Sequence, residues 1–212
     1  MIKTVIFDFD GTIADTFKAA VETINALAGK YGFKEIEAGE IEEFRAQGIQ
    51  GLIKKRHLSI LKLPKMLKDY TTLFQSKIPL QQPIKQIPQL LNELNQNGYD
   101  LNIITSNSVE NVSLFLNKHK LTCFKHIDSD QSLFGKDKVI ANFLKKYQIK
   151  NEEAIYVGDE VRDIEAAHKA KIKIMAVTWG FNYEEVLKQN SPDYLVNQPK
   201  QIAEVLEKIN TH

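Results

Sequence analysis

The sequence predicts an α/β protein built on a doubly wound parallel sheet, with an α-helical segment inserted after the first strand. Short apolar runs rich in β-branched residues, typical of strands buried in a parallel sheet, recur along the chain. Segments with apolar residues at three- and four-residue spacing separate these runs, as crossover helices do. Between residues 16 and 81 the alternation stops, and only helical patterns remain.

The expected elements alternate along the rest of the chain. Strands are expected at 2–7, 101–105, 154–157 and 173–177, with weaker ones at 125–127 and 194–196. Helices are expected at 87–97, 109–119, 138–147, 163–171, 183–190 and 200–209. Strands joined by such helices return to one sheet in parallel.

The inserted segment forms a second unit in this prediction. Its helical patterns cover about 17–31, 38–46, 49–60 and 64–77. Pro79, Pro83 and Pro88 crowd its exit and mark a linker rather than a packed element. We therefore expect a core made of residues 1–15 and 82–212, and a helical cap domain made of residues 16–81.

The composition excludes several classes of protein. Lys and Arg number 28 against 27 Asp and Glu, so the chain lacks the basic surplus typical of nucleic-acid binding. No apolar run approaches the ~18 residues of a membrane helix, and the first one is too short for a secretory signal. The only cysteine, Cys123, excludes a multi-thiolate zinc site. We expect a cytoplasmic protein that binds neither nucleic acid nor membrane. Its oligomeric state stays open, and a monomer is compatible with the sequence.

Two pairs of carboxylates follow expected strands. Asp8 and Asp10 end the first strand, where the two-residue period places them on one side. Asp159 and Asp163 follow the strand at 154–157. Ligands of open parallel sheets bind beyond the carboxyl ends of the strands, so the two pairs should meet in one crevice. Each pair also has a local explanation, because Asp-Gly is a common turn and Asp163 would suit a helix N-cap.

Carboxylates gathered in one crevice repel one another unless a cation neutralises them. All the ligands offered are oxygens, and no histidine stands in either motif, which favours Mg²⁺ over zinc.

Hydroxyl groups follow the strand at 101–105. Thr105 and Ser106 precede a helix, where hydroxyls and free N–H groups suit an anion. Asn107 with Glu110 would explain the same stretch as a capping pair. Of the two hydroxyls we favour Thr105, because it directly follows the apolar run.

Basic residues supply further candidates. Lys136 follows a glycine at the start of a helix, and Lys138 is the alternative in the next register. The run 54–57, Lys-Lys-Arg-His, could steer an anionic substrate, although such runs are more often solvated helix faces. Candidates for substrate contact in the inserted segment are Arg45, Gln47 and Gly48.

Together these motifs resemble those of the haloacid dehalogenase-like hydrolase superfamily, in the family's order and over essentially the whole chain. The matching residues are Asp8-Phe9-Asp10-Gly11-Thr12 for the first motif, Thr105 for the second, Lys136 for the third, and Gly158-Asp159 with Asp163 for the acidic motif. The resemblance implies a Rossmann-like core with an α-helical cap. Residues 177–182 and 191–194 look like stretches of phosphoglycolate-phosphatase-like members.

The resemblance implies a phosphatase that acts on a small, phosphoglycolate-like ester. Asp8 would attack phosphorus and form an aspartyl-phosphate. Asp10 would protonate the departing alkoxide and then deprotonate water. Members that cleave carbon–halogen or carbon–phosphorus bonds lack this second Asp, so phosphate-ester chemistry is favoured.

The remaining motif residues would bind metal and phosphate. Mg²⁺ would be held by Asp8, the backbone carbonyl of Asp10 and Asp159, with Asp163 supporting the metal site from behind. The phosphate oxygens would be held by Lys136 and by Thr105 or Ser106.

Two alternatives remain open from the sequence. A phosphomutase of the β-phosphoglucomutase type would use the same four motifs. A phospho-accepting signalling protein also combines an aspartate, Mg²⁺, a hydroxyl and a lysine. Such receivers are shorter, however, and their acceptor follows the third strand rather than the first.

Overall fold

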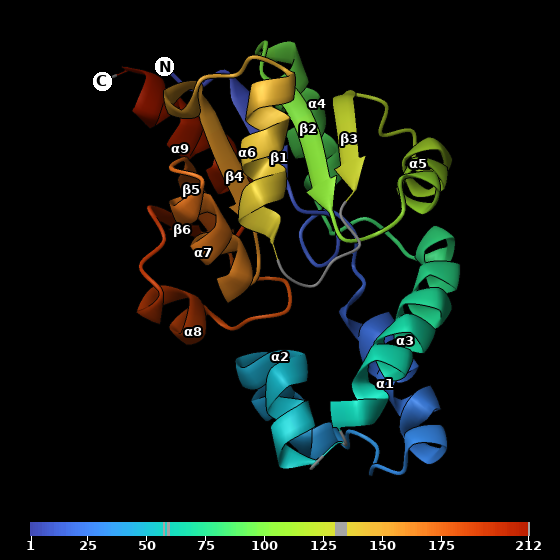
Figure 1. Ribbon diagram of the computed structural model, residues 1–212. Helices are drawn as coiled ribbons and strands as arrows, with labels where there is room; N and C mark the ends of the chain where they lie inside the picture. Colours follow the sequence, from blue (N-terminus) through green and yellow to red (C-terminus); the bar gives the residue numbers. More distant parts are fainter. Residues whose placement is uncertain (57, 59, 130–134, 212) are drawn as a thin grey trace.

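The computed structural model describes residues 1–56, 58, 60–129 and 135–211 (Figure 1). In these residues six strands form one parallel sheet in the order β3-β2-β1-β4-β5-β6. The strands are β1 (Thr4–Phe7), β2 (Asp100–Thr105), β3 (Phe124–Ser129), β4 (Ala154–Gly158), β5 (Lys173–Val177) and β6 (Tyr194–Val196). The predicted doubly wound sheet is confirmed. Its topological switch point lies between β1 and β4, where such sheets bind ligands.

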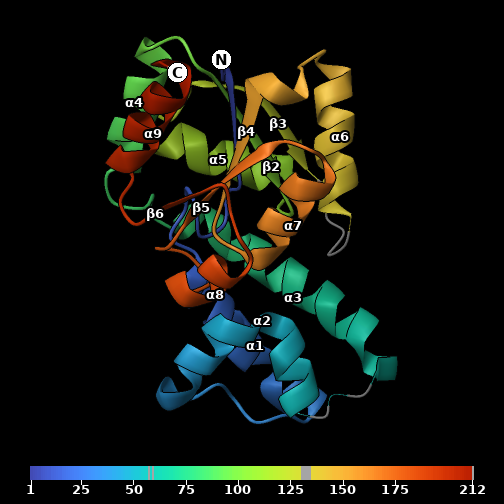
Figure 2. The same ribbon diagram turned by 90° about the vertical axis from the view of Figure 1, so that its left-hand side faces the viewer.

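Helices cover both faces of the sheet because successive strand residues point to opposite sides. Val5 and Phe7 pack into one core with α4 (Ile87–Gln96), α5 (Val109–Lys118) and α9 (Lys200–Thr211). Ile6 packs into the other with α6 (Lys136–Lys146), α7 (Val161–Lys169) and α8 (Glu184–Gln189). Figure 2 shows α4 and α9 on one side of the sheet and α6 and α7 on the other.

Three local predictions need correction at helix starts. The cap of α5 is Ser108, whose hydroxyl accepts the N–H of Asn111, so Asn107 with Glu110 is not the capping pair. Helix α7 begins at Val161 after Glu160, and Asp163 occupies its third position, so Asp163 is not the N-cap. Helix α6 begins at Lys136 rather than at residue 138.

The inserted segment is helical throughout its described elements. It contains α1 (Phe17–Tyr31), α2 (Ile41–Lys55) and α3 (Leu63–Lys77), joined by the 3-10 turns Ala38–Glu40 and Ile60–Lys62 and followed by Ile78–Leu80. These helices bury small cores of their own. Gly48 has φ 60° and ψ −159°, which breaks α2 where the sequence predicts two separate helices.

The inserted helices lie beyond the carboxyl ends of the strands, opposite the chain termini (Figure 1). The chain leaves and re-enters the sheet region side by side, since the N–H of Asp15 donates to the carbonyl of Gln82 at 2.9 Å. The candidate site therefore lies between the sheet and these helices. No helix among the described residues is long and apolar enough to cross a membrane.

Candidate active site

The four predicted carboxylates come together at the switch point of the sheet. Asp8 and Asp10 follow β1, and Asp159 follows β4, its neighbour in the sheet. Asp8 is 2% exposed and Asp10 is 7% exposed, whereas Asp159 and Asp163 are fully buried. Oxygens of Asp8, Asp159 and Asp163 lie within 4.8 Å of one another.

Asp163 organises this cluster from behind. Its Oδ2 accepts the N–H groups of Asp159 and Glu160, each at 3.1 Å. Its Oδ1 accepts a hydrogen bond from Lys136 Nζ at 2.5 Å. Both oxygens of Asp163 are thus engaged by the protein, which makes it a support for the site.

Asp159 is held by groups that the sequence-based site did not include. Thr12 Oγ1 donates to its Oδ1 at 2.6 Å, and the N–H of Phe181 donates to its Oδ2 at 2.7 Å. A Cβ at Gly11 or Gly180 would lie only 2.3 or 2.1 Å from the same Oδ2. Thr12 and Gly11 belong to the first motif, so their spacing beside Asp8 was a usable signal.

Lys136 is the lysine that reaches the carboxylates. Its Nζ lies 3.1 Å from Asp8 Oδ2, and it lies 5.1 Å from the centre of the Tyr156 ring. Gly135, with φ 108°, precedes α6, so that Lys136 is the first residue of that helix. Lys138 is exposed.

Thr105 ends β2 and is buried, whereas Ser106 is partly exposed. Thr105 Oγ1 accepts the N–H of Asn107 at 3.0 Å. Asn107 Nδ2 in turn donates to Asp10 Oδ2 at 3.2 Å. The sequence predicts Asn107 only as part of a capping pair. Asn107 follows two residues after the end of a strand at the site, and this position could have indicated its contact with Asp10.

Burial gives the site unusual protonation properties. It raises the pKa of Asp8 to about 6, although the charge of Lys136 opposes the change. Burial and the nearby charge of Asp8 raise the pKa of Asp10 to about 7. The pKa of Asp159 is also raised, by burial first and then by Glu160. The raised pKa values mean that these carboxyl groups are not all stable as anions together unless further positive charge lies beside them.

The donor atoms fit a hard divalent cation. Among the described residues, Asp8 Oδ2 and Asp10 Oδ1 are buried without a hydrogen-bond partner, although Lys136 forms an ion pair with the former. Unpartnered buried carboxylate oxygens are costly unless a positive charge compensates them. The residues gathered around them offer oxygen ligands, the set that Mg²⁺ and Ca²⁺ prefer.

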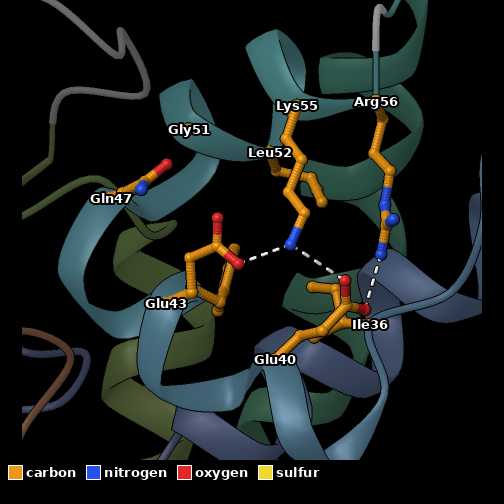
Figure 3. Close-up of a pocket in the computed structure, with 9 residues that line it drawn as sticks. Ile36, Glu40, Glu43, Gln47, Gly51, Leu52, Lys55 and Arg56 are labelled. Atoms are coloured by element: carbon orange, nitrogen blue, oxygen red, sulfur yellow. Dashed lines mark hydrogen bonds and ion pairs between the residues drawn. The ribbon is translucent and has the colours of Figure 1, made fainter.

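A second hollow lies within the inserted helices, around α2 (Figure 3). Lys55 Nζ pairs there with Glu40 at 3.0 Å and also with Glu43, and Arg56 Nη2 pairs with Glu40 at 2.6 Å. Two cations of the run 54–57 are therefore engaged by neighbouring carboxylates, which weakens the substrate-steering hypothesis. His57 lies outside the described residues.

The parallel sheet and the carboxylates gathered at its switch point are typical of α/β enzymes, which place their reacting groups at the carboxyl ends of the strands. A family model described as haloacid dehalogenase-like hydrolase matches residues 5–177. The chain belongs to this family of hydrolases.

Individual relatives cover almost the whole chain. A phosphoglycolate phosphatase of Synechococcus elongatus is 27% identical over 98% of this chain and 99% of its own length. The pyrophosphatase PpaX of Bacillus mycoides is 24% identical over 99% of each chain.

Solved structures agree with the fold. A haloacid dehalogenase-like hydrolase from Streptococcus pneumoniae has a TM-score of 0.83 at 26% identity, over 97% of this chain and 98% of that one. A predicted phosphatase from Clostridium acetobutylicum also reaches 0.83, at 24% identity, over 98% and 99% of the two chains.

Proposed function

We propose that this haloacid dehalogenase-like phosphatase uses Mg²⁺ to hydrolyse a small phosphate monoester through an aspartyl-phosphate on Asp8. The observation that carries the proposal is the convergence at the switch point. Asp8 follows β1, its Oδ2 lies 3.1 Å from Lys136 Nζ, and Asp159 stands beside it after β4. A carboxylate nucleophile needs such neighbouring positive charge to approach a phosphate dianion.

Asp8 and Asp10 have separate roles in this proposal. With a pKa of about 6, Asp8 is mostly ionised at neutral pH and is available to attack phosphorus. Asp10, with a pKa of about 7, retains a proton for the departing oxygen and can then take one from water. The hydrogen bond from Asn107 holds Asp10 in position.

The phosphate oxygens would be bound by Lys136 and by the hydroxyl of Thr105, with Ser106 as the alternative. Thr105 stands at the end of β2, just before the first N–H groups of α5, which suit an anion. Lys136 keeps its charge because Asp163 and Asp8 outweigh the effect of burial and raise its pKa.

Asp8, Asp159 and the backbone carbonyl of Asp10 would hold Mg²⁺, and Asp163 would support Asp159 through its backbone N–H. When bound, the ion would supply positive charge against the negative charge of the phosphate and of the carboxylates.

Residues 16–81 would act as a cap domain over this site. Its helices lie beyond the carboxyl ends of the strands (Figure 1), so in this proposal they would cover the site and limit the substrate to a small ester. The relatives named phosphoglycolate phosphatase and pyrophosphatase support phosphoglycolate as the first substrate to test and pyrophosphate as the second.

A phosphate-release assay over a panel of small phosphate esters, with Mg²⁺ or with chelator, tests the proposal. We expect Mg²⁺-dependent release by the wild type and none by Asp8→Asn. Asp10→Asn should lose about 10²- to 10⁴-fold in rate with the fold intact, because acid–base catalysis contributes that much. Undiminished release by Asp8→Asn contradicts the mechanism. Turnover that needs a bisphosphate activator and frees little phosphate indicates the mutase.

A further inference from the structure

We propose that Arg45 is a positioning residue that fastens the inserted helices to the core, and that the loop it grips also positions Asp159. The importance of Asp159 rests on the proposed function. The fastening itself rests on contacts between segments far apart in the sequence.

Arg45 joins α2 to the loop that follows β5. Its Nη1 donates to the carbonyl of Gly180 at 2.9 Å, and its own carbonyl accepts a hydrogen bond from Asn182 Nδ2 at 2.6 Å. Its guanidinium carbon lies 4.0 Å from the centre of the Phe17 ring and 5.4 Å from that of Tyr183. Arg45 therefore binds the core loop through both its side chain and its backbone, and it stacks on aromatic rings from both parts.

The same loop grips Asp159 from its other side. The N–H of Phe181 donates to Asp159 Oδ2 at 2.7 Å, and the N–H of Asn182 donates to the Asp159 carbonyl at 3.2 Å. Asn182 Oδ1 accepts the N–H of Val161, the first residue of α7, at 2.9 Å. Asn182, which is 8% exposed, thus touches both Arg45 and the segment that carries Asp159.

A separate set of contacts holds the other end of the inserted helices. Asn111, Lys118 and His119, all at or just after α5, bond to the carbonyls of Gln75, Pro79 and Gln81 at 2.9 to 3.0 Å. In Figure 1, α3 meets the α5 side of the core, whereas Figure 2 shows α2 directly below α8. Loss of the Arg45 side-chain contacts would therefore loosen the α2 side, which would keep the Asn182 bond to the Arg45 carbonyl, while the attachment at α5 persists.

Two consequences follow. Release at Arg45 opens the crevice for substrate entry and product exit. It also frees the loop at Gly180–Asn182, so Asp159 is positioned less firmly when the inserted helices move away from the core. Because Asp159 would bind the metal, closure of the inserted helices over the core and metal affinity are coupled through this loop.

The test compares Arg45→Met, Arg45→Lys and the matched control Lys54→Met, which removes an exposed cation from the same helix. Trp179, the only tryptophan, stands next to Gly180 and donates through Nε1 to the Thr12 carbonyl at 3.2 Å. Acrylamide quenching of its fluorescence in metal-free protein reports the fastening without any activity. Two further measurements are made: Tm as a function of Mg²⁺ concentration, and kcat and KM for the best ester.

For Arg45→Met we expect quenching to rise about twofold or more. The Mg²⁺ concentration that gives half of the rise in Tm should increase by roughly tenfold, and so should KM. A change of about tenfold is the equivalent of losing one hydrogen bond to a charged group. Arg45→Lys, which keeps one donor, should fall between Arg45→Met and the wild type, and Lys54→Met should match the wild type. The Lys variant also keeps the test open if Arg45→Met folds poorly.

If Trp179 in both Arg45 variants is quenched no more than in the wild type, Arg45 does not fasten the inserted helices. If quenching increases but Tm responds to the same Mg²⁺ concentrations as in the wild type, the fastening is not coupled to Asp159. Failure of the proposed function has a different signature: the wild type then neither releases phosphate nor responds to Mg²⁺, while Arg45→Met still alters the quenching of Trp179.

Discussion

A single methyl group at position 180 should disable the site by displacing Asp159. A Cβ at Gly180 would lie 2.1 Å from Asp159 Oδ2 and 2.4 Å from its Cβ, whereas ordinary contact begins at 3.4 Å. Because the Cβ of Asp159 is itself in the way, rotation of the carboxylate does not relieve the clash. Asp159 must retreat by roughly 1 Å, and a displacement of that size lowers the rate by about 100-fold.

The stability of Gly180→Ala should fall much less than its activity. Overpacking of this kind costs about 1 to 3 kcal/mol, which lowers the Tm of a chain of this size by roughly 2 to 12 °C. Gly29→Ala is the matched control, since nothing lies within 4 Å of its added Cβ in α1. It should keep full activity and gain about 0.5 to 1 kcal/mol in the free energy of unfolding.

Phosphate release at saturating substrate, and the rise in Tm with Mg²⁺, measure the two variants. Gly180→Ala should lose both the turnover and the Mg²⁺ response at temperatures where it is still folded. A Gly180→Ala protein with the wild-type rate and the wild-type Mg²⁺ response would refute the argument that the position of Asp159 is critical.

Lys136→Met should lower phosphate release at least about tenfold, because Lys136 contacts Asp8. The control Lys138→Met, at an exposed position of the same helix, should match the wild type in the same assay. In metal-free protein, the free energy of unfolding should fall as pH rises from about 4 to about 7. The pKa values of Asp8 and Asp10 are raised to about 6 and about 7, so the native state retains protons that the unfolded state has lost. Urea unfolding over a pH series measures this, and a rise across the window would contradict it. Ser108→Ala should cost about 1 kcal/mol in thermal unfolding, because Ser108 accepts an N–H of the first turn of α5.

The order of strands and helices was predictable because each element carries its own periodicity. The strand predicted at 125–127 extends over Phe124–Ser129. The sequence showed only part of it because none of its residues is fully buried and its apolar pattern is faint. Helix α6 starts earlier than predicted because Gly135, in the left-handed region, provides the turn into it. Local pattern thus located the elements, while their ends depended on turn geometry.

The candidate site was predictable where it depends on strand ends. Asp8 and Asp159 each follow a buried strand, and parallel neighbours bring their carboxyl ends to the same edge. The contact between Asn107 and Asp10 was missed, because it joins residues 97 apart through the packing of β2 beside β1. Arg45 was predicted as a substrate contact candidate, whereas the structure shows it bound to the Gly180 carbonyl.

By itself the sequence determined the alternating core, the inserted helices and the row of carboxylates at strand ends, because periodicity and chain order are local properties. The sequence favoured Lys136 over Lys138, but only the tertiary structure shows that Lys136 lies against Asp8, and that one loop contacts both Arg45 and Asp159. These contacts depend on how far and at what angle whole elements pack against one another. Burial at that packed edge also raises the pKa values of Asp8 and Asp10, since these side chains lose their water only in the folded chain.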